Sequence, residues 1–371
     1  MTKILIIGSG PYGVGIANTL SEYKIPFSIC GNTFDLWLEH TLSTMSIRSD
    51  WHTSEIYSSK NRFGMKKFIF DNYKDDAKEI IQNKIPINLF RNYLKYVQNN
   101  LDFPVKRKAV TGLSRKGNAF ICEFSDGEIE EAERVVIATG IGLHVSIPEE
   151  IKKLNSKNIY HCYFVNDYED LKNKKILIIG AGQSAGEGIV HLKKNNKITW
   201  VYKTKPVYYS EPLNLPTPVF KLILNISPFF YYLPDRMKKK FGKKYVISTI
   251  TPDLQEELEA GDVEKVHIDA NELELDNRGN KVVSKKLGKE FDAVISATGY
   301  RYHINNLKFL DNDIKKDIEN RNGIPGLDYD FQTSIKNLYM VGGIAEPVYG
   351  PAQRFMMGAR HAAKRILRAL I

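Results

Sequence analysis

The order of hydrophobic and polar residues predicts that one local structure occurs twice in this chain. Residues 4–7 are apolar at every position and end at Gly8, and residues 176–179 repeat this pattern and end at Gly180. A strand that is apolar on both faces is typical of a buried parallel sheet, and a glycine directly after it is typical of a turn into a helix. The chain is therefore expected to contain two βαβ units and to have an α/β fold.

The first glycine loop reads GSGPYG and has the G-x-G-x-x-G spacing of a dinucleotide-binding turn. In this spacing the first glycine makes the tight turn, the second leaves room for a pyrophosphate, and the third lets the helix pack on the strand. The helix is expected to extend to about Tyr23, and residues 27–30 are expected to form the next strand. The predicted cofactor-binding residues of this loop are Gly8, Gly10, Pro11, Tyr12 and Gly13.

The second glycine loop reads GAGQSA, the G-x-G-x-x-A variant of the same spacing. Its predicted cofactor-binding residues are Gly180, Gly182, Gln183, Ser184 and Ala185. The strand expected at residues 198–202 is followed by Lys203 and Lys205, where an acidic residue would select NAD. Because lysines can pair with a 2′-phosphate, both are predicted to bind NADP, unless they are ordinary solvated lysines of a lysine-rich chain. Two such loops predict two Rossmann-like dinucleotide-binding domains.

Composition and charge narrow the classes of function. The 371 residues are enough for two or three domains, and 53 basic against 43 acidic residues give a formal charge of +10, which favours anionic ligands. None of the common nucleic-acid-binding, metal-binding or hydrolase motifs occurs, so neither a nucleic-acid partner nor a metal ion is predicted. The three cysteines are isolated, and the first residues do not resemble a signal peptide. A cytoplasmic protein without a membrane-spanning helix is expected.

Two further motifs indicate a family. Residues 135–140 end in Ala-Thr-Gly, and residues 292–300 read D-x-x-x-x-A-T-G-Y. Together with the glycine loops, and with Gly186-Glu187 after the second one, these motifs resemble the class B flavin-dependent monooxygenases, which include flavin-containing and N-hydroxylating enzymes. The resemblance implies FAD and NADPH as cofactors. It adds further cofactor-binding residues, namely Thr139, Gly140, Thr298, Gly299, Tyr300, Gly342 and Gly343.

The resemblance also implies how the domains are arranged. A discontinuous FAD-binding domain would comprise residues 1–160 and 301–371, and the NADP-binding domain would be inserted as residues 161–300, with a cap near 205–260. A helix is expected to begin at Gly350-Pro351, because apolar residues recur at helical spacing after it.

Two acidic residues expected in such a flavoprotein are absent. The position after the second strand, where an acid usually holds the ribose, is occupied by Gly31 and Asn32, so Asn32 is the predicted substitute. Many members of the resembling family have an aspartate where this chain has Gly343. The ribityl chain is therefore expected to use backbone groups or water at that position.

The activity implied by the resemblance is oxygen transfer. NADPH would reduce FAD, O2 would form a C4a-hydroperoxyflavin, and oxygen would pass to nitrogen or sulfur of a small organic substrate. Because the cofactor carries the chemistry, no catalytic residue is predicted. Tyr300, Arg301 and Asn305 are candidates for the nicotinamide side and residues 49–52 for the flavin side, whereas His161 is expected to be structural. Two alternatives stay open, namely an NADPH-dependent flavin oxidoreductase without oxygen transfer and a non-catalytic NADP-binding flavoprotein.

Residues 218–247 have an unusual composition that allows two interpretations. Aromatic and aliphatic residues are followed by a cluster of lysines between 238 and 244. Such a segment is typical of a helical cap over a substrate channel, which is the favoured prediction, but also of weak docking on an anionic membrane surface.

Overall fold

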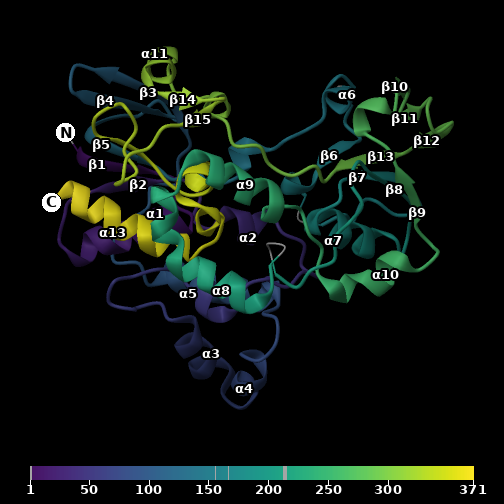
Figure 1. The fold of residues 1–371 in the computed structure, drawn as a ribbon, viewed down its shortest axis with the longest axis horizontal. Coiled ribbons are helices and arrows are strands. Elements are labelled where there is room, and N and C mark those ends of the chain that lie inside the picture. Colours follow the sequence, from purple (N-terminus) through teal and green to yellow (C-terminus); the bar gives the residue numbers. More distant parts are fainter. Residues whose placement is uncertain (1, 155, 166, 212–214) are drawn as a thin grey trace.

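The computed structural model describes residues 2–154, 156–165, 167–211 and 215–371. Figure 1 shows two α/β units, one carrying β1 and both chain ends and the other carrying β7. Each unit is built around its own mainly parallel sheet, so the predicted α/β fold is confirmed. In the described part of the chain, no helix has the length and apolar character needed to cross a membrane.

The first sheet has the strand order β2-β1-β5-β4-β3, with β16 also pairing with β5. The parallel strands are β1 (Thr2–Ile7), β2 (Ser28–Cys30), β5 (Ile129–Ile137) and β16 (Leu338–Met340). The antiparallel strands β3 (Val110–Lys116) and β4 (Ala119–Phe124) extend the sheet. Two helices share its core, α1 (Pro11–Glu22) and α13 (Gly358–Leu370). Since β16 and α13 come from the C-terminal segment, both ends of the chain build this unit.

The second sheet is entirely parallel and has the order β6-β13-β7-β8-β9. Its strands are β6 (Ile159–His161), β7 (Lys175–Ile179), β8 (Lys197–Tyr202), β9 (Glu264–His267) and β13 (Ala293–Ser296). The helix α7 (Gln183–Leu192) follows the second glycine loop as the sequence predicts. The strand β6 belongs to this sheet and includes residue 160, where the sequence predicts the end of the first domain. The exact domain boundary stays a prediction.

The remaining helices and small sheets lie outside the two main sheets. Helices inserted after β2 have a core of their own and are α2 (Asp35–Glu39), α3 (Met65–Tyr73), α4 (Ala77–Ile80) and α5 (Ile87–Asn99). The other helices are α6 (Glu149–Lys152), α8 (Thr217–Ile226), α9 (Asp235–Tyr245), α10 (Gln255–Glu259), α11 (Asn312–Asp317) and α12 (Glu346–Tyr349). The small sheets comprise β10 (Leu275–Arg278), β11 (Lys281–Ser284) and β12 (Lys289–Phe291), and β14 (Asn320–Arg321) and β15 (Ile324–Pro325).

The chain crosses between the two units in two segments, one around Val145 and one around Tyr300, and these crossing segments run side by side. Val145 and Tyr300 form an antiparallel bridge, and the Ser146 amide donates to the Gly299 carbonyl at 2.9 Å. The Thr298 hydroxyl donates to the Ser146 carbonyl. The predicted A-T-G-Y motif therefore joins the two crossing segments through main-chain and side-chain hydrogen bonds.

The expected helix at Gly350-Pro351 is wrong in its starting point. Residues Pro351–Arg354 form a single 3₁₀ turn, Phe355 is extended, and the α-helix begins only at Gly358. The Tyr12 hydroxyl lies 2.9 Å from the Gln353 carbonyl oxygen and 3.0 Å from that of Phe355. An α-helix would use these carbonyls as internal acceptors, so the tertiary contact of Tyr12 stabilises the break.

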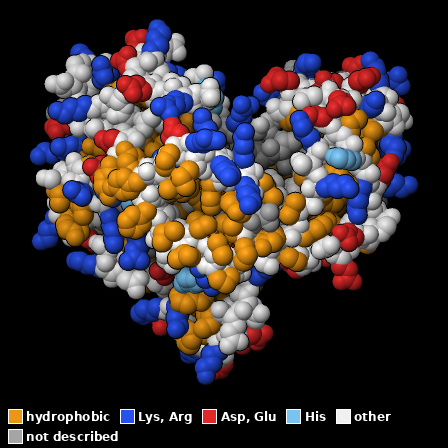
Figure 2. All heavy atoms as spheres, viewed as in Figure 1, with side chains coloured by type: hydrophobic (Ala, Val, Ile, Leu, Met, Phe, Trp, Pro, Cys, Tyr) orange, Lys and Arg blue, Asp and Glu red, His pale blue; other side chains and the backbone are white. Residues whose placement is uncertain are grey.

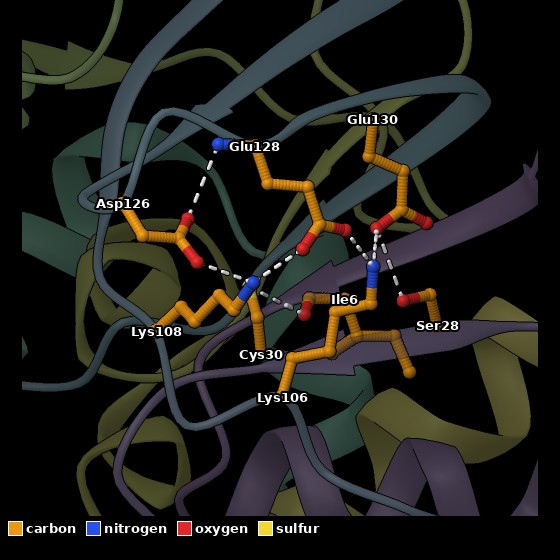
Figure 3. A network of polar contacts seen from close by, with 8 residues as sticks. All are labelled: Ile6, Ser28, Cys30, Lys106, Lys108, Asp126, Glu128 and Glu130. Carbon is orange, nitrogen blue, oxygen red and sulfur yellow. Dashed lines mark hydrogen bonds and ion pairs between the residues drawn. The ribbon is translucent and has the colours of Figure 1, made fainter.

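A network of ion pairs attaches β2 to the β4–β5 hairpin (Figure 3). The Lys106 ammonium lies 2.6 Å from the Glu128 carboxylate and 3.0 Å from that of Glu130. The Lys108 ammonium lies 2.5 Å from Asp126 and also contacts Glu128. The Lys106 backbone amide donates to the Ile29 carbonyl, and the Lys106 carbonyl accepts from the Gly31 amide, each at 2.9 Å. The network therefore holds the end of β2 beside the first glycine loop.

Candidate functional site

The carboxyl ends of β1, β5 and β16 meet at one edge of the first sheet, the usual place for a ligand in such folds. The segments that leave this edge line a cavity of about 960 Å³, which also reaches Arg48 and Gln183. Gln183 begins the helix after the second glycine loop. The cavity therefore brings residues of both glycine loops to one space.

Half of the predicted cofactor-binding residues line this cavity. They are Gly8, Gly10, Pro11, Tyr12, Asn32, Thr139, Gly140, Gln183, Gly342 and Gly343. The others do not line the cavity. They lie in the two glycine loops where these pack against a helix or sheet, at the end of β8, or in the crossing segment around Tyr300. They are Gly13, Gly180, Gly182, Ser184, Ala185, Lys203, Lys205, Thr298, Gly299 and Tyr300.

The glycines of the first loop differ in what surrounds them. A Cβ on Gly13 would lie 1.8 Å from the Gly8 carbonyl oxygen, and a Cβ on Gly8 would lie 2.3 Å from the Ala138 oxygen. A Cβ on Gly10 would have no atom within 4 Å, and Gly10 lines the cavity. Close packing at the outer two glycines and open space at the middle one is the arrangement that a bound pyrophosphate needs.

Buried polar atoms without partners show that the cavity fits a large polar ligand. Gln353 is 1 % exposed, and both its amide oxygen and its amide nitrogen have no hydrogen-bond partner within the described structure. The buried hydroxyl of Ser9 in the glycine loop has none either. Such atoms cost free energy unless a ligand or water satisfies them. Both residues line the cavity, so the site fits the FAD predicted from the sequence. Gln353 carries no sequence motif that could have indicated it.

The Tyr302 side chain lies where the Cβ of the expected aspartate at position 343 would be. A Cβ on Gly343 would lie 1.9 Å from the Tyr302 hydroxyl oxygen and 2.1 Å from the ring carbon that bears it. Burial raises the pKa of Tyr302 to about 12, so its hydroxyl stays protonated. Since Tyr302 also lines the cavity, a phenol occupies the space that an acidic side chain would need.

Replacing Gly343 by aspartate should therefore damage the site rather than restore it. We expect Gly343→Asp to lower the free energy of unfolding by about 1–3 kcal/mol through overpacking against Tyr302, and to weaken FAD binding. Adding Tyr302→Ala should recover part of the stability. The measurements are urea unfolding and FAD titration. Gly261→Asp is the control because a Cβ there has no atom within 4 Å. Equal effects of both aspartates would contradict the explanation.

The second glycine loop is packed against its sheet and against the segment that precedes α10. A Cβ on Gly180 would lie 2.2 Å from the Ala297 oxygen, and the Trp200 indole donates to the Gly180 carbonyl at 2.7 Å. The Gln183 side-chain oxygen accepts a hydrogen bond from the Thr251 backbone amide at 2.9 Å, and the Gln183 side-chain nitrogen donates to the Glu187 carboxylate at 2.8 Å. Gln183 therefore positions the loop through protein contacts, in addition to lining the cavity.

The predicted 2′-phosphate contacts lie at the end of β8. Lys203 is exposed, and its ammonium lies 2.6 Å from Asp269, which raises the pKa of the lysine through this hydrogen bond. Lys205 is exposed as well. A phosphate at Lys203 would have to share or replace the Asp269 carboxylate, so the role of both lysines stays a prediction.

Arg48 is a residue that the sequence did not indicate. Its guanidinium donates to the carbonyls of Tyr209 at 3.0 Å, Glu211 at 2.7 Å and Thr249 at 3.2 Å, and to the Thr249 hydroxyl at 2.9 Å. Burial lowers its pKa to about 10, so it stays charged near neutral pH. Arg48 lines the cavity and thus connects the insertion after β2 to the segments around Tyr209 and Thr249.

The remaining candidates divide between cavity and surroundings. Ser49 lines the cavity, whereas residues 50–52 do not, and Asp50 lies 3.1 Å from the Lys221 ammonium. Arg301 and Asn305 also lie outside the lining. The buried ring of His161 accepts a hydrogen bond from the Tyr163 amide at 3.1 Å and caps the turn that follows. This geometry agrees with the structural role expected for His161.

Comparison with known proteins identifies the family. The model of the pyridine nucleotide-disulphide oxidoreductases matches residues 5–214, which is more than half of the chain. The chain belongs to this family. This oxidoreductase is also 23% identical over 346 residues to the trimethylamine monooxygenase of Pelagibacter ubique, covering 86% of this chain and 65% of that protein. It is 23% identical over 344 residues to the probable indole-3-pyruvate monooxygenase YUCCA9 of Arabidopsis thaliana, covering 81% and 75%.

The fold of this oxidoreductase is also that of a solved N-hydroxylase. The ornithine N-hydroxylase KtzI of Kutzneria sp. 744, in a structure described as containing reduced FAD, NADP⁺ and L-ornithine, superposes with a TM-score of 0.79. The match covers 100% of this chain and 99% of KtzI at 15% identity. The predicted resemblance to class B flavin-dependent monooxygenases with two dinucleotide-binding domains is confirmed.

Proposed function

We propose that this oxidoreductase is an FAD- and NADPH-dependent monooxygenase that oxygenates a small organic substrate at nitrogen or sulfur. The observation that carries the proposal is the single cavity lined by both the first glycine loop and Gln183 of the second. Electron transfer from a nicotinamide to a flavin requires the two rings to meet, and such a shared space allows it.

The names of two of the three relatives favour nitrogen as the oxygenated atom. The trimethylamine monooxygenase and the ornithine N-hydroxylase both carry names that refer to amines. We therefore propose an amine as the first substrate class to test, followed by thioethers. The chain spans 65% of the length of the trimethylamine enzyme, so the substrate itself is not transferred from it.

The residues of the cavity would bind FAD and exclude water. Bound FAD, once reduced by NADPH, would supply the reaction with O2. The backbone at Gly10 would approach the pyrophosphate, and Ser9 and Gln353 would hydrogen-bond polar atoms of the cofactor. Apolar side chains of the lining would limit access of water to the reacting atoms. They are Phe34, Trp37, Met45, Phe355 and Met356.

The number, spacing and burial of the cysteines argue that no internal disulfide accepts the flavin electrons. The sequence has three cysteines and no C-x-x-C pair. Burial raises the pKa of Cys30 and of Cys122 to about 12, and that of Cys162 to about 11. Thiols of this kind are poor nucleophiles because almost none is ionised near neutral pH. Oxygen is therefore preferred over a protein dithiol as the acceptor of the flavin electrons.

The test is rapid mixing of the reduced holoenzyme with oxygen. The protein is loaded with FAD, reduced by NADPH without oxygen, and mixed with oxygenated buffer while the absorbance spectrum is recorded. We expect a transient near-ultraviolet band, and an oxygenated product when an amine is present. Direct return to the oxidised spectrum without product would indicate a flavin oxidoreductase. Protein that stays colourless after addition of FAD would indicate a non-catalytic NADP-binding protein.

A further inference from the structure

The segment of residues 217–245 has an outer face that its packing does not explain. It comprises α8, a 3₁₀ turn at Ser227–Tyr232, and α9. Six of the thirteen large apolar side chains that are exposed in the described structure lie in this segment. They are Val219, Leu222, Ile226, Phe229, Tyr232 and Met237. Scattered apolar residues are normal on a surface, but a cluster of this size marks an interaction site.

The inner face of the same segment packs against Phe355 and the loop before α13. Phe220 is buried, and its ring packs against that of Phe355 with 5.7 Å between centroids. Phe355 lines the cavity. The Phe230 ring fills the space next to Gly350, and the ring centroids of Tyr231 and Tyr349 are 5.3 Å apart. The segment therefore packs one set of apolar residues inward and exposes another, and its role as a cap stays a prediction.

The outward residues share one side of the segment. Val219, Leu222 and Ile226 are spaced three and four apart, which places them on one stripe of α8. Phe229 and Tyr232 are three apart in a 3₁₀ turn, where such side chains eclipse. Their exposed fractions are 68% for Phe229 and 63% for Tyr232. The apolar stripe therefore continues from the helix into the turn.

Positive charge borders this stripe. Residues 217–245 contain seven lysines and arginines but a single acid, Asp235, which contacts Arg321. Four exposed lysines of α9 have no ion-pair partner within the described residues. They are Lys239, Lys240, Lys243 and Lys244. Figure 2 shows the apolar side chains gathered over α8 in the middle of one face, with Lys and Arg side chains next to them over α9.

We infer that this face docks on an anionic lipid bilayer, with the apolar stripe inserted at the headgroup level and the lysines on the lipid phosphates. An apolar stripe with lysines beside it fits such an interface, where acyl chains and anionic headgroups lie within a few ångströms of each other. A protein partner would also cover apolar area, but acidic lipid satisfies four uncompensated lysines without a specific complementary surface. Docking would place this segment next to the bilayer.

Sedimentation of the FAD-loaded protein with lipid vesicles tests this inference. We expect the protein to bind vesicles of phosphatidylcholine with phosphatidylglycerol and not vesicles of phosphatidylcholine alone, with binding reduced by high salt. Lys240→Glu with Lys243→Glu should reduce partitioning about thirtyfold or more, because each basic residue near an anionic surface contributes about fivefold. Leu222→Ser with Phe229→Ser should reduce it at least tenfold. All four side chains are exposed, so the fold should be retained.

Matched controls separate docking from general stickiness. Lys172→Glu with Lys174→Glu makes the same charge change on exposed lysines of the second unit, and Ile129→Ser removes an apolar side chain that is 63% exposed elsewhere. Neither control should change partitioning by more than about twofold. Equal binding to neutral and anionic vesicles, or equal effects of test and control variants, would overturn the inference. So would a dimer in solution that Leu222→Ser with Phe229→Ser dissociates, because a second copy would then cover the face.

Discussion

Arg48→Met is expected to lower the free energy of unfolding by about 3 kcal/mol and to slow flavin reduction by NADPH at least tenfold. The guanidinium donates to the carbonyls of Tyr209, Glu211 and Thr249 and to the Thr249 hydroxyl. Hydrogen bonds to a charged group contribute about 1.5–3 kcal/mol each, and the cost of burying the charge offsets part of their sum. Methionine keeps the apolar part of the side chain but leaves these buried acceptors without a donor. Urea unfolding and anaerobic stopped-flow reduction are the two measurements.

The comparison variants show whether Arg48 acts by connecting the two regions. Arg48→Lys keeps the charge but lacks the planar fork that reaches several acceptors, so an intermediate effect is expected. Arg278→Met is the matched control, because its exposed guanidinium makes one ion pair of 3.5 Å with Glu290. FAD affinity should change little in Arg48→Met, since the glycine loop is untouched. A large loss of FAD binding with an unchanged reduction rate would contradict the role that we assign.

Stability should fall steeply between about pH 6.5 and pH 4 because of two buried histidines, His144 in a crossing segment and His161 in β6. Burial lowers the pKa of His144 to about 4, with a smaller contribution from the charge of His303, and burial also lowers that of His161 to about 4. The unfolded chain takes up these protons near pH 6.5, whereas the folded chain does so only near pH 4. Between these values the unfolded state binds more protons, so stability decreases as pH falls. Each histidine contributes about 3 kcal/mol at most.

Substitutions isolate the contribution of the two histidines. His144 Nδ1 faces the Asn306 amide nitrogen and the His303 backbone amide, each at 3.4 Å, so His144→Gln supplies an acceptor that does not titrate. We expect His144→Gln with His161→Gln to flatten the pH dependence in this range, and the exposed His52→Gln to leave it unchanged. Burial raises the pKa of Glu187 and Glu346, which acts in the opposite direction, so the difference from wild type is the quantity to measure. Parallel curves for wild type and double variant would contradict the prediction.

The local elements of both nucleotide-binding units were predictable from the sequence. The helix expected to extend to about Tyr23 ends at Glu22, and the strand expected at residues 198–202 is observed at Lys197–Tyr202. Patterns of this kind depend on neighbours a few residues apart, since a buried strand must be apolar and the turn after it needs glycine. The two glycine loops and the A-T-G-Y motif therefore indicated the family before any contact was known.

The residues that complete the site were not predictable in this way. Arg48 and Gln353 have ordinary sequence surroundings, and Tyr302 lies two residues beyond the A-T-G-Y motif without being part of it. Each acquires its role from residues far away in the chain. Tyr302 occupies the space beside Gly343, and Arg48 reaches Thr249. The helix expected at Gly350 begins at Gly358 because Tyr12, more than three hundred residues away, takes the carbonyls of the intervening turn. No periodicity records such contacts.

The sequence by itself determined the α/β class, the two dinucleotide-binding loops and the family, because these follow from backbone requirements that only certain residues meet locally. Only the tertiary structure decided which residues share the cavity, which side chain lies beside Gly343, and that residues 217–245 have both a buried and an exposed apolar face. Those features depend on which surfaces remain exposed after the two units and the C-terminal segment have packed together. In the sequence, an apolar residue of this segment has the same appearance whether it packs against the protein, like Phe220 on Phe355, or faces the solvent, like Phe229.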